Sequence, residues 1–133
     1  MGRPQHIKNE QLWRKHCRQI VARSHDLIAG RLGVIETARE MYKLSFWVGA
    51  RADPDFALFK KIADESGSLP IGKVQNEWAL SALAALKPRI DAIENTWRSQ
   101  ALAAARNLVA KYEWSLKKNL RRDRASGAAG NIV

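Results

Sequence analysis

The stretch that decides the fold is residues 88–122, which read PRIDAIENTWRSQALAAARNLVAKYEWSLKKNLRR. Pro88 suits the first turn of a helix, where its missing N–H costs no hydrogen bond, so we expect one helix from Pro88 to Arg122. A continuous helix of this length would measure about 50 Å. Side chains spaced by three to five residues fall near one side of it and need helical partners: Ile90, Ile93, Trp97, Ala101, Ala104, Leu108, Tyr112, Ser115 and Leu120.

Two more helices are predicted in the first 50 residues. Asn9 is a favourable N-cap for a helix that reaches about residue 29, and Gly30 is a natural place for it to stop. Apolar side chains at helical spacing then predict a second helix over Arg31–Val48, ending at Gly49. Gly30 and Gly33 could instead let a single helix continue with a kink.

The middle of the chain is punctuated by prolines and glycines. Asp53 followed by Pro54 predicts a helix cap and a first-turn proline, opening a short helix that ends near Glu65. Residues 66–72, SGSLPIG, read as a loop because Gly and Pro concentrate there. Another short helical segment, Trp78–Leu86, precedes the long helix, and we find no credible pair of strands.

The composition is that of one folded domain. A chain of 133 residues can bury one core, and 46% hydrophobic residues with five Trp argue against disorder. We predict an all-α, single-domain bundle of about four to five helices over residues 1–124, followed by a flexible tail at residues 125–133. Cys17 is the only cysteine and no apolar run approaches the roughly 20 residues that cross a bilayer, so we expect a cytoplasmic protein without a membrane partner.

The formal net charge of +10 is concentrated near the two ends of the chain. Residues 1–23 carry six Lys or Arg against one acidic residue, and residues 117–124 carry five against one. No recognition motif accompanies these charges, and cations at a helix C-terminus also complement the helix dipole. They nevertheless make the strongest candidates for binding nucleic acid or an acidic partner: Arg14, Lys15, Arg18, Lys117, Lys118, Arg121, Arg122 and Arg124.

Each residue group that could form a catalytic or metal site is better explained by an ordinary structural role. His25 and Asp26 lack the further His and Asp ligands that a metal-dependent phosphohydrolase needs. Glu36 and Glu40 could serve as an acid and a base, but their spacing to basic neighbours is typical of a solvated helix face. The five tryptophans lie mostly at positions that follow the apolar period of the helices. We therefore expect them to pack in the core and not to form a surface on which bases stack. We therefore expect no enzymatic activity, no metal and no cofactor.

Several short motifs taken together resemble a family of small bacterial proteins of unknown function. They are AGRLGVIETAR at residues 29–39, DPDF at 53–56 with Phe59, and LPIG at 69–72 before Trp78. Members are similar in a glycine-flanked helix start, a D-x-D-F turn and an L-P-[IV]-G loop, and the resemblance covers roughly residues 20–110. An acidic-polar-His run that precedes Leu-Pro in such proteins is ESGS here, so no catalytic His is implied. The resemblance implies an accessory protein in a setting similar to that of immunity proteins paired with secreted toxins.

Two functions follow from these patterns. We expect a non-enzymatic protein-binding module, an immunity (antitoxin-like) protein that neutralises a cognate bacterial toxin by occluding it. The alternative is a basic helical nucleic-acid-binding protein. The residues predicted to bind the partner lie on the second helix and the middle loop: Arg31, Glu36, Arg39, Ser66, Ser68 and Lys73.

Overall fold

The computed structural model describes residues 3–116, and within this range the chain is helical without strands. The predicted basic residues from Lys117 onward and the predicted tail at residues 125–133 lie outside the described residues. The all-α, single-domain prediction is confirmed. The elements are α1 (Glu10–Ile28), α2 (Val34–Val48), α3 (Pro54–Ser66), the 3₁₀ helix η1 (Gly72–Glu77) and α4 (Leu80–Tyr112).

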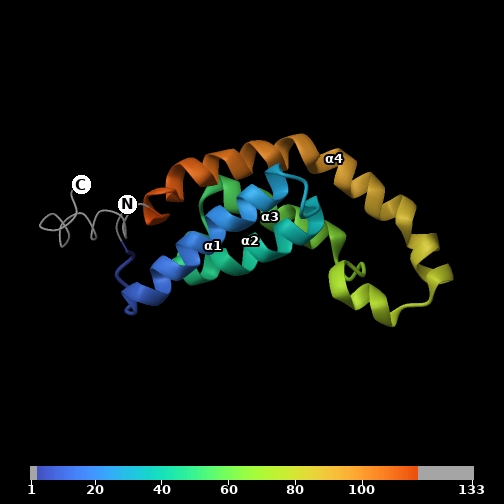
Figure 1. Ribbon diagram of the computed structural model, residues 1–133, viewed down its shortest axis with the longest axis horizontal. Helices are drawn as coiled ribbons and strands as arrows, with labels where there is room; N and C mark the ends of the chain where they lie inside the picture. Colours follow the sequence, from blue (N-terminus) through green and yellow to red (C-terminus); the bar gives the residue numbers. More distant parts are fainter. Residues whose placement is uncertain (1–2, 117–133) are drawn as a thin grey trace, which may run out of the picture.

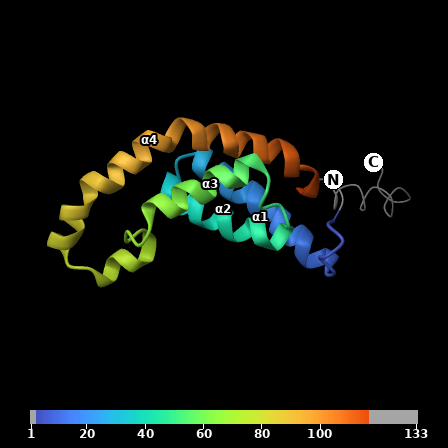
Figure 2. The ribbon, with the colours of Figure 1, turned by 180° about the vertical axis from the view of Figure 1, so that it is seen from behind.

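The first three helices form a body that one part of α4 covers. The C-terminal part of α4 runs along α1 and α3, while most of α2 lies on the far side of the body and only its N-terminal end meets α4 (Figures 1 and 2). The chain leaves α3 through the segment that contains η1 and extends past the body, and the N-terminal part of α4 returns to it (Figure 1). We call residues 67–90, which make up this extension, the limb.

A single hydrophobic core lies between the four α-helices. Phe56 and Phe59 of α3 are at most 1% exposed, and the ring of Phe56 meets that of Tyr112 edge-on at 6.2 Å. Burying side chains of this size stabilises the fold by about 1.5–3 kcal/mol each. The stripe predicted along the long helix is buried as expected at five positions of α4: Ile93, Ala101, Ala104, Leu108 and Tyr112.

Local sequence signals set most helix ends where they were predicted. Asn9 Oδ1 accepts a hydrogen bond from the Leu12 N–H at 2.9 Å, which caps α1. Gly49 ends α2 in a left-handed conformation, with φ of 70°. Asp53 caps α3, and Pro54 occupies its first turn. These three predictions are confirmed.

The prediction for the second helix needs correction at its start. Gly30 adopts φ of 80° and opens a turn, so α1 and α2 are separate helices and not one kinked helix. The second helix begins at Val34 and not at Arg31, because Gly33 is its N-cap residue.

The prediction for the long helix is wrong at both ends. The helix α4 begins at Leu80 and passes through Pro88, so Trp78–Leu86 is not a separate helical segment. Pro88 and Ala84 are both exposed, and the Ala84 carbonyl, which loses its N–H partner to the proline, can therefore be hydrated. The helix ends at Tyr112 with Glu113 as its C-cap, so it does not run unbroken toward Arg122.

Candidate interaction surface

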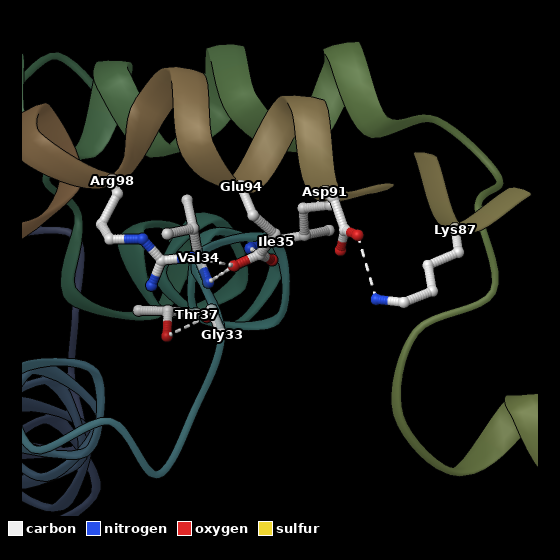
Figure 3. Close-up of polar contacts among 8 residues, drawn as sticks. All are labelled: Gly33, Val34, Ile35, Thr37, Lys87, Asp91, Glu94 and Arg98. Atoms are coloured by element: carbon white, nitrogen blue, oxygen red, sulfur yellow. Dashed lines mark hydrogen bonds and ion pairs between the residues drawn. The ribbon is translucent and has the colours of Figure 1, made fainter. Parts of the chain in front are cut away.

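A carboxylate from α4 fixes the point at which the limb leaves the body. No side chain of α2 itself caps its N-terminus, and Glu94 does so from a distance of 60 residues in sequence. Its two carboxylate oxygens accept hydrogen bonds from the Val34 and Ile35 N–H groups at 2.8 and 2.9 Å (Figure 3). A negative charge at a helix N-terminus is favourable, so this contact ties α4 to α2.

Gly33 makes that approach possible. Its φ of −78° is open to any residue, so backbone conformation does not require glycine here. A Cβ at this position would lie 3.0 and 3.1 Å from the two carboxylate oxygens of Glu94. A side chain at residue 33 would therefore crowd the cap, and glycine leaves Glu94 room to approach.

A second brace holds the start of the limb against α2. Arg39 Nη2 donates to the carbonyl oxygens of Gly67 and Leu69, both at 3.0 Å, and lies 3.4 Å from Ser66 Oγ. Burial lowers the pKa of Arg39 from its usual value. One turn earlier, Glu36 lies against Gly72, where a Cβ would be 3.4 Å from its carboxylate. These contacts fix the path of the chain out of α3.

The residues predicted to bind the partner have different surroundings. Arg39 and Ser66 belong to the brace, where Ser66 Oγ also donates to the Ala63 carbonyl. Arg31 pairs with Asp26 at 2.9 Å, and this hydrogen bond lowers the pKa of Asp26. The other members are half-buried Glu36 beside Gly72 and the exposed limb residues Ser68 and Lys73.

The limb carries apolar side chains that the body leaves uncovered. Val74 and Trp78 are each 41% exposed, and Leu80 at the start of α4 is 85% exposed. Several exposed large apolar side chains on one short segment are typical of interaction sites. Trp78 is the only one of these three side chains that the sequence motifs singled out. Val74 and Leu80 were missed because exposure depends on where neighbouring helices end, and no periodicity reports that.

Two hollows lie on the limb, and Trp78 lines one of them. The first, of about 280 Å³, is lined by Gln75, Leu83, Ala84, Lys87, Ile90 and Asp91. The second, of about 250 Å³, is lined by Ser66, Ser68, Leu69, Pro70, Trp78, Leu86 and Arg89. Gln75 Nε2 donates to the Pro70 carbonyl at 2.9 Å, and so links η1 to the preceding loop. Both hollows are open depressions with mixed polar and apolar walls.

The basic residues predicted on α1 have different surroundings. The Arg14 guanidinium lies 5.7 Å from the ring centroid of Trp13 and 5.3 Å from that of Trp114, and its Nε is 3.1 Å from Glu10. It is therefore part of the packing between α1 and the segment after α4. Lys15 is exposed and Arg18 is half-buried. Within the described part of the chain, neither packs on tryptophan rings as Arg14 does.

The tryptophans divide between core and surface. Trp13 is 2% exposed as predicted, but the core prediction is wrong for Trp47 and Trp78, which are 53% and 41% exposed. Trp47 lies near the C-terminal end of α2, and its ring stacks on that of His16 at 5.4 Å with an angle of 21° between their planes. A third hollow, of about 250 Å³, opens beside these two rings.

The groups weighed for catalysis lie apart. His25 is exposed, and Glu40 is 3.5 Å from Lys43 on the surface of α2. Among residues 3–116, no group of three or more His, Cys, Asp or Glu side chains is placed to hold a metal ion. Cys17 is buried, and burial raises the pKa of its thiol to about 12. No helix within the same range has the length and apolarity to cross a membrane.

Comparisons with protein-family models, curated proteins and solved structures gave no match to this chain. The resemblance carried by the short motifs therefore stays a prediction. The function has to be inferred from the geometry of the described residues.

Proposed function

We propose that this chain is a non-enzymatic protein-binding module that contacts its partner through the limb. The observation that carries the proposal is the exposure of Val74, Trp78 and Leu80 on a segment that is braced at both of its attachments to the body. Interfaces concentrate their binding energy in a few apolar and aromatic anchors. Trp78 and Leu80 are such anchors.

The bracing makes the limb suited to binding. Glu94 holds the α4 side of the limb, and Arg39 holds the loop side. A surface that is ordered before it meets its partner loses less conformational entropy on binding. The limb therefore presents its apolar side chains at a lower entropic cost than a flexible loop of the same composition.

Charges around the limb favour an acidic partner. Lys73 and Arg89 are exposed on the limb against one exposed acidic residue, Glu77, and Lys87 is paired with Asp91 at 2.9 Å. Opposite charge at the rim of an interface accelerates association and selects partners. Following the resemblance, we propose that the partner is a toxin that this chain occludes, with the limb covering the toxin's functional surface.

The test uses the product of a toxin-like reading frame beside this gene. The tagged full chain is titrated with that product, and co-expression is scored for rescue of growth. Leu80→Glu is the informative variant, because an acidic residue in the first turn of a helix favours α4 and leaves the fold intact. Trp47→Leu is the control, because Trp47 is also exposed, at 53%, but lies outside the limb.

We expect Leu80→Glu to weaken binding by about tenfold or more and to abolish rescue, whereas Trp47→Leu changes the affinity by less than about twofold. Failure of the unmodified chain to bind the product or to rescue growth would refute the toxin-occluding function. Equal affinities for the unmodified chain and Leu80→Glu would refute the limb as the contact surface.

A further inference from the structure

The third hollow, between α1 and α2, combines an open aromatic ring with cations. It is lined by His16, Gln19, Arg23, Glu40, Lys43, Leu44 and Trp47. More than half of the Trp47 side chain is open to solvent although its ring already stacks on His16. His16 Nδ1 is 2.8 Å from Gln19 Oε1, which fixes the imidazole and with it the stacked pair.

Two basic side chains line the same hollow. Lys43 is 67% exposed, and its 3.5 Å contact with Glu40 neutralises the one carboxylate in the wall. Arg23 reaches Asp26 at 2.9 Å through Nη2, but its Nε is buried without a hydrogen-bond acceptor among the described residues. The Arg23 side chain as a whole is 38% exposed, so its guanidinium can donate to a ligand rich in acceptor oxygens.

A second exposed aromatic residue precedes Trp47 on α2. Phe46 is 45% exposed, and the Arg51 guanidinium lies 4.7 Å from its ring centroid. Phe46 does not line the hollow, so Trp47 supplies its open ring. This end of α2 is opposite to the end that Glu94 caps, so the surface is distinct from the limb.

We propose that this surface binds single-stranded nucleic acid, with a base stacked on Trp47 and phosphate oxygens on Lys43 and Arg23. Proteins that bind single strands pair basic grooves with open aromatic rings, because every base has a face that can stack. The bases of a duplex are already stacked on one another and cannot reach such a ring. The net charge of +10 favours a polyanion. This site adds a function to the one proposed for the limb.

The test measures fluorescence anisotropy of a labelled oligothymidylate of about 20 nucleotides with the full chain at about 50 mM salt. Parallel titrations use a duplex of the same length, heparin as a polyanion without bases, and an acidic polyglutamate peptide. Trp47→Leu removes the stacking ring and Lys43→Gln removes a cation. Trp78→Leu is the matched control, because Trp78 is also exposed but lies on the limb. The basic residues at 117–124 are present in every variant and cancel in the comparison.

We expect Trp47→Leu to weaken oligothymidylate binding by about tenfold and to leave heparin binding within about twofold. Lys43→Gln weakens both, and Trp78→Leu weakens neither. Far-UV circular dichroism confirms that each variant is folded. Three results would overturn the proposal: no binding of oligothymidylate at low salt, equal loss of oligothymidylate and heparin binding in Trp47→Leu, or tighter binding of the duplex than of the single strand. Loss of polyglutamate binding alone in Trp47→Leu would assign the surface to an acidic protein segment instead.

Discussion

Removing the carboxylate of Glu94 should destabilise the protein far more than removing a neighbouring carboxylate on the same helix. Glu94 is 15% exposed and accepts two backbone hydrogen bonds, at 2.8 and 2.9 Å, from the N-terminus of α2. Hydrogen bonds to charged groups contribute about 1.5–3 kcal/mol and N-caps about 1 kcal/mol. Because solvent still reaches this site, we take the lower range and expect Glu94→Ala to cost about 2 kcal/mol of unfolding free energy. Glu94→Gln keeps one acceptor oxygen, so we expect it to cost about 1 kcal/mol.

Asp91, one turn earlier on α4, provides the control (Figure 3). It pairs only with Lys87 at 2.9 Å, and the two side chains are 50% and 71% exposed. Exposed pairs of this kind contribute about 0–0.5 kcal/mol, so Asp91→Ala should be nearly neutral. Urea unfolding followed by far-UV circular dichroism measures all three variants. The reasoning is refuted if Glu94→Ala and Asp91→Ala differ by less than about 0.5 kcal/mol.

Gly33 gives an independent check of the same contact. A Cβ at Gly33 would press on both oxygens of Glu94, so Gly33→Ala should cost about 1 kcal/mol in the unmodified chain. In the Glu94→Ala background the space is free, and Ala should be neutral or stabilising by about 0.5 kcal/mol because it restricts the unfolded chain. The difference between backgrounds is the coupling energy of the pair. Equal costs in both backgrounds would show that Gly33 serves something other than room for the cap.

Two further predictions concern buried and half-buried polar groups. Lys111 donates to Asp53 at 2.6 Å and to Asp55 at 3.0 Å, and the bond to Asp53 is the main reason that its pKa is raised above 10.5. Lys111→Met should therefore cost about 1 kcal/mol at neutral pH, and its difference in Tm from the unmodified chain should shrink as pH rises above 10.5 toward the folded pKa. A difference that stays constant up to complete lysine deprotonation would contradict the assignment. Cys17 is 0% exposed with a thiol pKa of about 12, so only about one thiol in ten thousand is ionised at about pH 8. An aromatic disulfide reagent should label it in urea but not in buffer, and rapid labelling of the folded chain would show that α1 opens locally.

The helices that local chemistry specifies were predictable. Asn9, Gly49 and the Asp53-Pro54 pair act on their own neighbours in the chain, and each sets a helix end where the sequence indicated it. The start of α4 was not predictable in the same way. Pro88 is a strong local signal for a helix start, but an exposed proline can be accommodated inside a helix when the freed carbonyl reaches water.

The candidate sites show the same division between local and long-range effects. Trp13 and Trp47 both lie on amphipathic helices, yet one is 2% and the other 53% exposed, because only the first faces the core. The sequence made Arg39 a plausible residue for contacting a partner. In the structure its guanidinium instead donates to backbone carbonyls of the limb.

The sequence by itself determined that this protein is helical, where α1 and α3 begin, and which stripe of α4 is buried, because propensity, capping and periodicity act over a few residues. Only the tertiary structure decided that Glu94 caps α2, that the limb extends past the body, and that Trp47, Trp78 and Leu80 remain uncovered. These features depend on contacts between residues tens of positions apart, and such contacts leave no period in the sequence.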